Sequence, residues 1–265
     1  MNLTTTQMEF YHENGHFILE NLFSKDEVNE LSSKIAAFKN FKHLPNIVCE
    51  DDGSVRSVYM PNRHEEVYET LYRCERLVEP CKQLLENDIY LYQYKLNLKR
   101  AFTGQAWEWH QDYTYWKIDD GVEKPDMISG MIYLNDVKSY QGPLMIIPGS
   151  HKFDVVDFEP KEHLEELDEL INSLSADLKF TVEQSYIKKM ANKNGIKVLE
   201  YNAGTCVFFH PNLFHASMGN LSPYKRDTAI ITYNSVDNLP KILDRPSYIC
   251  SDVYTAIKPS KMTFC

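Results

Sequence analysis

The sequence lacks any apolar run that could cross a membrane, because a spanning helix needs about 20 consecutive apolar residues. It also lacks internal repeats and low-complexity segments, which excludes solenoids and other repeat architectures. No signal peptide is recognisable at the N-terminus. We therefore expect one domain over residues 1–265 and no membrane partner.

Cysteine is scarce, and the six cysteines form no C-x-x-C pair. Without a signal peptide, this pattern indicates reduced thiols and a cytoplasmic protein.

Positive charge is also in deficit: 28 Lys and Arg residues face 38 Asp and Glu residues, a net charge of −10. This balance argues against nucleic acid or an anionic membrane as a partner and leaves a small molecule as the expected ligand. The hydrophobic content of 43% and charged content of 25% are ordinary for a soluble globular protein with a sizeable core. Nothing in the sequence specifies an oligomeric state.

Periodicity predicts helices near the N-terminus and strands through the rest of the chain. A short helix should end near Gly15, before a strand at 16–20. Ser24 and Glu27 form a capping-box pattern at the start of a helix over 25–38. Further expectations are strands at 46–50 and 54–59 and a helical region over 65–87, where Pro80 suggests two helices or a break.

The stretch 89–102 alternates along its whole length and predicts a long strand. Its apolar face should pack in the core, while Gln93, Lys95, Asn97 and Lys99 should face water or a cavity. Later strands are expected at 127–137, 144–147, 197–201, 206–210 and 228–233. The Lys- and Glu-rich stretch 159–194 has helical spacing and is an insertion, either a lid or a helix packed outside.

The most informative segment, 107–116, reads W-E-W-H-Q-D-Y-T-Y-W and contains an H-x-D at His110 and Asp112. In an extended strand, side chains two apart point the same way, so both groups can bind one metal ion. A distant histidine would complete a 2-His-1-carboxylate triad, which leaves open positions on non-haem iron(II). H-x-D alone is a weak signal, and both His210 and His215 are candidates for the third ligand.

The combination of H-x-D, F-H-x-S-x-x-N-x-S, a following arginine, and G-P-L-x-x-x-P-G-S-H at 142–151 resembles the phytanoyl-CoA dioxygenase superfamily. In that family the metal histidine precedes S-x-x-N and the arginine follows eleven positions later, which selects His215 and Arg226. The resemblance implies a mainly β fold with flanking helices, a double-stranded β-helix of the jelly-roll, cupin-like kind. Gly142 and Gly149 are expected to be conformational necessities.

The resemblance also implies an iron(II)/2-oxoglutarate oxygenase that uses O2 and releases succinate and CO2. His110, Asp112 and His215 would hold iron, and the Arg226 guanidinium would pair with the far carboxylate of 2-oxoglutarate. The full set of implied co-substrate residues is Gln93, Asn97, Trp107, Ser217 and Arg226. Because Asp112 is retained, the family pattern favours hydroxylation over halogenation.

For the substrate, segments of the chain resemble ectoine hydroxylases and, more closely, a free L-leucine 5-hydroxylase. This implies a free aliphatic L-amino acid, leucine-like, with another small zwitterion or natural-product intermediate as the alternative. The candidate substrate residues are Arg56, Tyr59, Trp116, Phe209 and Arg245, of which the two arginines have the alternative of being surface residues. A zinc enzyme with the same triad and a non-catalytic binding protein also remain open.

Overall fold

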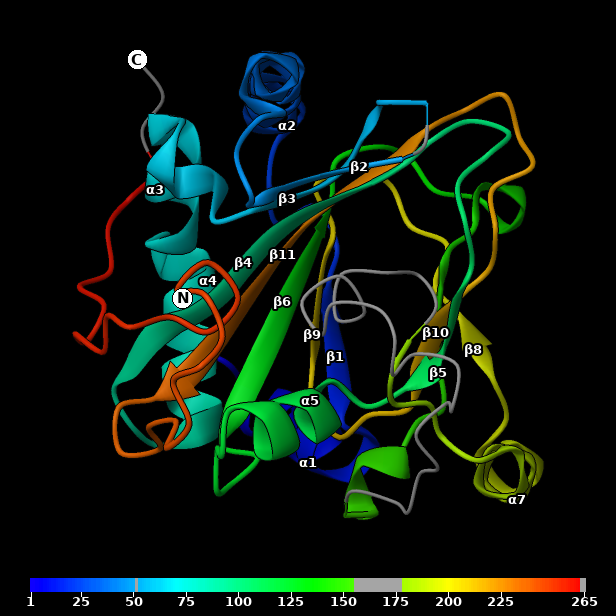
Figure 1. Cartoon of the computed structure of the whole chain (residues 1–265). Coiled ribbons are helices and arrows are strands. Elements are labelled where there is room, and N and C mark those ends of the chain that lie inside the picture. Colours follow the sequence, from blue (N-terminus) through cyan, green and yellow to red (C-terminus); the bar gives the residue numbers. More distant parts are fainter. Residues whose placement is uncertain (51, 155–177, 263–265) are drawn as a thin grey trace.

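The computed structural model describes residues 1–50, 52–154 and 178–262 and shows two antiparallel sheets facing each other (Figure 1). The larger sheet has the order β1-β9-β6-β11-β4-β3-β2, and the smaller has the order β5-β10-β7-β8. This confirms the predicted jelly roll with flanking helices. In the described part of the chain, no helix is both long and apolar enough to span a bilayer.

The strands are β1 (His16–Leu19), β2 (Ile47–Cys49), β3 (Val55–Tyr59), β4 (Ile89–Lys99), β5 (Trp107–His110), β6 (Met127–Tyr133), β7 (Leu144–Ile146), β8 (Lys197–Val198), β9 (Cys206–Phe209), β10 (His215–Ser217) and β11 (Arg226–Ser235). The α-helices are α1 (Thr5–Asn14), α2 (Lys25–Lys34), α3 (Glu66–Tyr72), α4 (Glu75–Leu85), α5 (Asp112–Asp119) and α7 (Gln184–Asn194). Short 3-10 helices are η1 (Ile35–Phe41), η2 (Pro61–Arg63), η3 (Ser139–Gln141) and η4 (Ser150–Lys152).

The capping box predicted from Ser24 and Glu27 is confirmed. The Ser24 hydroxyl accepts from the Glu27 amide at 3.3 Å, and the Glu27 carboxylate accepts from the Ser24 amide at 2.7 Å. This capping box begins α2, although the end of the expected helix winds into η1.

The region expected to form two helices or a broken one does form two, α3 and α4, but Pro80 lies inside α4 and does not interrupt it. The chain breaks instead at Cys74, which is extended at ψ 126°. Ser260 in the C-terminal segment forms backbone hydrogen bonds on both sides of this residue, to Arg73 and Glu75, each 2.9 Å long. A contact distant in sequence therefore decides where the helix is interrupted.

The expected alternation of β4 holds at its C-terminal end and fails near its start. Opposite β11, Gln93 pairs with Thr232 but Leu91 pairs with Tyr233, so Tyr92 is an extra, bulged residue. Leu91 therefore packs in the core beneath the helices, and Tyr92 packs in a different cluster with Trp116. The bulge restores the predicted facing for the polar residues that follow it.

The predicted insertion at 159–194 is described only in part. Its end forms α7, whose Met190 packs in a small cluster with Phe214 and Val182. Residues 159–177 lie outside the described residues, and the lid prediction therefore stays a prediction.

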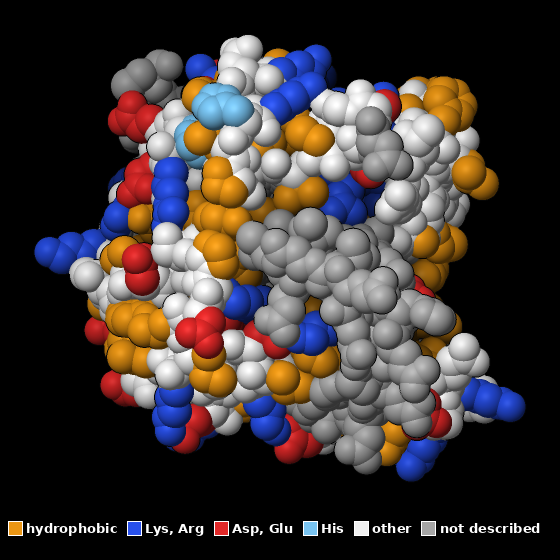
Figure 2. All heavy atoms as spheres, viewed as in Figure 1, with side chains coloured by type: hydrophobic (Ala, Val, Ile, Leu, Met, Phe, Trp, Pro, Cys, Tyr) orange, Lys and Arg blue, Asp and Glu red, His pale blue; other side chains and the backbone are white. Residues whose placement is uncertain are grey.

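On the face in Figure 2, lysine and arginine side chains are interspersed with acidic and apolar ones.

Candidate active site

The smaller sheet brings two histidines into direct opposition. His110 on β5 and His215 on β10 are cross-strand partners, and their ring centroids lie 4.0 Å apart. One oxygen of Asp112, Oδ1, lies 3.7 Å from Nε2 of His110 and 3.8 Å from Nε2 of His215. The potential ligand atoms of all three residues lie within 4.8 Å of one another, so these residues could hold a metal ion.

The H-x-D segment is not the continuous strand that its sequence predicted. β5 ends at His110, and Asp112 is the first residue of α5. Gln111 between them is still extended, at φ −118° and ψ 124°, which keeps the imidazole and the carboxylate on the same side. Trp116 lies on the same helix, and its ring centroid is 5.4 Å from that of Tyr92.

The geometry of both imidazoles fits metal coordination. Nδ1 of His110 lies 2.7 Å from the Glu108 carbonyl, and Nδ1 of His215 lies 2.9 Å from the Leu213 carbonyl. A carbonyl only accepts, so each Nδ1 carries the proton and each Nε2 presents its lone pair to Asp112. Such outer hydrogen bonds orient metal-binding histidines in proteins.

The protonation states fit as well. Burial and the neighbouring His215 lower the pKa of His110 to about 3, which keeps this imidazole neutral. Burial alone would raise the pKa of Asp112, but His215, Lys95 and His110 lower it below its ordinary value. One carboxylate and two imidazoles form the donor set typical of non-haem iron(II).

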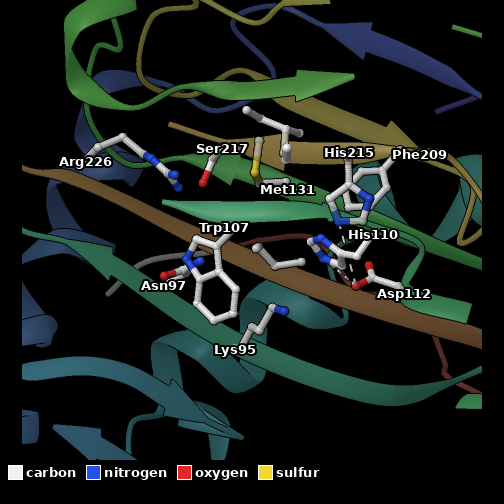
Figure 3. Close-up of a pocket in the computed structure, with 13 residues that line it drawn as sticks. Lys95, Asn97, Trp107, His110, Asp112, Met131, Phe209, His215, Ser217 and Arg226 are labelled. Atoms are coloured by element: carbon white, nitrogen blue, oxygen red, sulfur yellow. Dashed lines mark ion pairs between the residues drawn. The ribbon is translucent and has the colours of Figure 1, made fainter. Parts of the chain in front are cut away.

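A first cavity runs from this triad to Arg226 (Figure 3). Arg226 is 3% exposed, and its Nε and Nη2 donate to the Gly142 carbonyl at 3.2 and 3.0 Å. Among the described residues, no carboxylate forms an ion pair with it. Asn97, Trp107 and Ser217 line the space between, as their implied co-substrate role requires.

Gly142 is confirmed as a conformational necessity. Its φ is +70°, and a Cβ there would lie 2.4 Å from the Met218 carbonyl oxygen. This close approach is what allows the Gly142 carbonyl to reach the Arg226 guanidinium. Gly149 has a similar φ of +76°.

A second cavity meets the first at the triad, sharing Lys95, Trp107, His110 and Asp112 with it. Tyr59 and Trp116 line this second space, as predicted for substrate residues. The remaining lining residues are Gln93, Tyr115, Leu178, Arg245 and Ile249.

Gln93, predicted for the co-substrate, and Phe209, predicted for the substrate, line different cavities from most residues predicted for the same role. Gln93 lines the second cavity and donates from Nε2 to the Ile249 carbonyl at 2.9 Å. Phe209 lines the first cavity, with its ring centroid 5.3 Å from that of His215. For Gln93, alternation along the strand predicted only that the side chain faces water or a cavity.

The two candidate substrate arginines differ in position. Arg245 lines the second cavity, but Nε and Nη2 donate to the two carboxylate oxygens of Asp120, the first at 2.7 Å. Arg56 lies behind Trp107, with its guanidinium 5.6 Å from the ring centroid, and is absent from the described lining of either cavity. Neither arginine is therefore a solvent-exposed surface residue.

His210 takes no part in the triad. Its Nδ1 accepts from the Asn212 amide at 3.1 Å, and its ring packs against Tyr11 and His151. The sequence interpretation missed Lys95, which lines both cavities and acts electrostatically on Asp112. Its place on the polar face of β4, between Gln93 and Asn97, was the signal that identifies it.

Comparisons with known proteins agree with this geometry. The family model for phytanoyl-CoA dioxygenase (PhyH) matches residues 11–228. An L-proline trans-4-hydroxylase of Streptomyces griseoviridis is 34% identical over 250 residues, which cover 94% of this chain and 93% of that protein. An ectoine dioxygenase of Bordetella bronchiseptica is 30% identical over 272 residues, covering 97% and 85%.

Solved structures are similar over nearly the whole chain. EctD from S. alaskensis with 2-oxoglutarate and 5-hydroxyectoine has a TM-score of 0.83 at 26% identity, covering 98% of this chain and 89% of that one. The same enzyme with bound Fe has a TM-score of 0.82 at 26% identity, covering 98% and 88%. The chain therefore belongs to the phytanoyl-CoA dioxygenase family and is an iron- and 2-oxoglutarate-dependent dioxygenase.

Proposed function

We propose that this enzyme hydroxylates a free aliphatic L-amino acid of leucine-like size, with release of succinate and CO2. The observation that carries the proposal is the pair of cavities that meet at the triad. One cavity ends in a buried arginine without a carboxylate partner among the described residues, and the other is lined by both apolar and cationic side chains.

In this proposal His110, Asp112 and His215 hold iron(II), which, once bound, supplies the activation of O2. The protein's own contribution is positional. The carbonyls of Glu108 and Leu213 fix both rings with Nε2 facing Asp112. The water-excluding walls of the barrel keep the reacting groups apart from solvent.

For 2-oxoglutarate we propose that Arg226 pairs with the far carboxylate, because a guanidinium matches a carboxylate through two parallel hydrogen bonds. Ser217, Asn97 and Trp107 line the same cavity and would complete the site. Gln93 lies in the other cavity, so we assign it to the substrate instead.

For the substrate we propose that Tyr59, Trp116 and Leu178 surround the aliphatic side chain. A free amino acid also carries a carboxylate, which needs positive charge. Lys95 lines this cavity and supplies such charge, whereas Arg245 also lines it but is paired with Asp120. Among the described residues, Lys95 has no ion pair that would occupy its ammonium group.

Proline is the second candidate substrate. The relative that is 34% identical to this chain is named L-proline trans-4-hydroxylase, and proline is a small apolar zwitterion of similar size. Ectoine, named in other relatives, is a third compound of this kind.

We further propose that residues 1–265 form one catalytic domain, because Arg245 and Ile249, beyond the family match, line the second cavity. A cytoplasmic location also remains our proposal. It agrees with the free thiols of Cys49, Cys74, Cys81, Cys206 and Cys250.

The test is to incubate the purified protein with iron(II), 2-oxoglutarate and each proteinogenic amino acid or ectoine. Succinate and products that gain one oxygen are measured by mass spectrometry, with His215→Ala as the inactive control. Oxygen gain on leucine supports the proposal, and gain on proline alone supports the second candidate. Succinate at background level with every aliphatic amino acid contradicts the substrate class.

A further inference from the structure

The strand pairing that joins the two histidines does not extend to the carboxylate ligand. β5 pairs with β10 only as far as His110, and Asp112 already belongs to α5. The Asp112 carboxylate approaches Nε2 of His215 to 3.8 Å, which is too long for a hydrogen bond. The sheet therefore fixes His110 against His215, whereas other contacts must hold the carboxylate at this distance.

A tight turn at 210–213 lies between β9 and His215. Its backbone closes with a hydrogen bond from the Leu213 amide to the His210 carbonyl, 2.9 Å long. Pro211 occupies the second position of the turn, where the fixed φ of proline is favourable. The carbonyl groups of this turn are therefore held in a defined arrangement.

Two of these carbonyls accept hydrogen bonds from the segment that carries Asp112. The Pro211 carbonyl accepts from the Tyr113 amide at 3.1 Å. The Asn212 carbonyl accepts from Nε2 of Gln111 at 3.0 Å. Because the two donors belong to the residues before and after Asp112, these bonds hold the aspartate from both sides.

The next carbonyl of the same turn holds the distant histidine. The Leu213 carbonyl accepts from Nδ1 of His215 at 2.9 Å. Three successive carbonyls thus bind the segment of Asp112 and the ring of His215. Since all three carbonyls belong to one turn, the turn determines how far the carboxylate lies from the imidazole.

Gln111 forms its bond from an enclosed side chain. It is 1% exposed and is absent from the lining of both cavities. Adjacent side chains of an extended segment point to opposite sides, so Gln111 points away from the face shared by His110 and Asp112. Its Nε2 also lies 3.4 Å from the Asp154 carbonyl, so both amide hydrogens have an acceptor. The side chain therefore links the metal-binding segment to backbone that is distant in the sequence.

We propose that Gln111 is a positioning residue for the metal centre: through the turn at 210–213 it holds the Asp112 carboxylate at coordinating distance from Nε2 of His215. This inference rests on the proposed assignment of the triad to iron. Gln111 itself contributes no ligand atom. A side chain without N–H donors at this position should leave the two histidines paired but allow the carboxylate to move.

The first experiment is a titration of the iron-free protein with cobalt(II), an ion that accepts the same nitrogen and oxygen ligands. Its visible absorption reports affinity and coordination geometry together. In Gln111→Met, which keeps the length of the side chain and loses both N–H donors, cobalt(II) should bind roughly 10-fold more weakly, with an altered spectrum. Either an unchanged affinity or an unchanged spectrum would overturn the proposal.

Gln111→Asn is the second variant. It keeps the amide but is one methylene shorter, so the amide falls short of the Asn212 carbonyl. This variant should also weaken cobalt(II) binding, and it decides the test if Gln111→Met does not fold. An affinity equal to that of the unmodified protein would contradict the inference.

A double-mutant cycle with His215→Ala separates positioning from general structural support. The proposed contact acts between two segments, so Gln111→Met should change cobalt(II) affinity less than about 2-fold once His215 is absent. The full loss in that background would mean that Gln111 acts on His110 and Asp112 alone, which contradicts the inference.

Two controls separate the possible failures. Gln83→Met removes a glutamine whose Nε2 also donates to a backbone carbonyl, that of Glu79 on α4, at 3.0 Å, and it should leave cobalt(II) affinity unchanged. An equal loss in Gln83→Met would contradict a specific role of Gln111. If His215→Ala binds cobalt(II) normally, the triad itself is wrongly assigned; if only Gln111→Met binds normally, the inference alone fails.

Discussion

His110 and His215 lie directly opposite each other across the β5–β10 pair, with both Nδ1 atoms held by backbone carbonyls. The metal-binding geometry is therefore built into strand pairing of the smaller sheet. Asp112 joins from the first turn of α5. Three local structures thus have to form together before the triad exists.

The first prediction concerns the third ligand. His215→Ala should lose iron(II) affinity by more than the roughly 10- to 100-fold that is typical when only an outer hydrogen-bond partner is removed. Activity should fall to background, because one of the three ligands is missing. Iron content after dialysis against limiting iron, together with succinate formation, measures both effects.

His210→Ala is the matched control, since His210 is a partly buried histidine that lies five positions earlier and is absent from the triad. This variant should keep its iron. Loss of iron in His210→Ala with retention in His215→Ala would reverse the assignment.

The second prediction concerns Arg226. Arg226→Met should weaken 2-oxoglutarate binding by at least about 30-fold, equal to about 2 kcal/mol, because a buried charge pair is lost. Arg226→Lys should recover only part of this affinity, since an ammonium cannot make the two parallel hydrogen bonds of a guanidinium. The KM for 2-oxoglutarate measures both; full recovery by lysine would show that charge alone matters.

The third prediction concerns Asp120, which is fully buried and receives hydrogen bonds from Arg245 and Tyr92. Asp120→Ala should lower the free energy of unfolding by roughly 3–5 kcal/mol, because it removes the buried carboxylate that Arg245 contacts most closely and leaves only Asp119, at 3.8 Å. Chemical denaturation measures the loss. Glu123→Ala, which removes the exposed partner of Lys241, should change stability little. Equal effects in the two variants would contradict this reading.

The fourth prediction concerns pH. Burial lowers the pKa of His16 to about 4 and of His210 to about 3, so both are neutral in the folded protein. The unfolded chain binds these protons at pH values near 6.5, and stability should therefore be full above that pH and fall as the pH drops toward 4. Unfolding free energies across this range measure the slope.

In His210→Asn, where the amide oxygen can still accept from the Asn212 amide, the slope should decrease by up to about 1.4 kcal/mol per pH unit. An unchanged slope would mean that His210 does not titrate differently in the two states. Both proteins are measured without iron, so that the triad contributes equally to the two slopes.

The chemistry of the site was largely predictable from the sequence, because metal ligands and co-substrate cations are few residue types at characteristic spacing. The inward facing of Asn97 followed from alternation together with the family resemblance. The start of α5 at Asp112 could not be predicted. The residue before it, Gln111, is extended, which is compatible both with a continuing strand and with the residue that precedes a helix. The Arg245–Asp120 pair was equally invisible, because it joins segments that only the folded barrel brings together.

The bulge at Tyr92 divides β4 into two halves with opposite facing. Before it, tyrosines point toward the wall that surrounds the second cavity; after it, polar residues point toward the triad and Arg226. Deleting Tyr92 would turn the side chains before it to the opposite face of the sheet. The side chains after it would keep their facing. With the cavities assigned as we propose, a change at Tyr92 would alter the second cavity, which takes the substrate. It would leave the first cavity, which takes 2-oxoglutarate, unchanged.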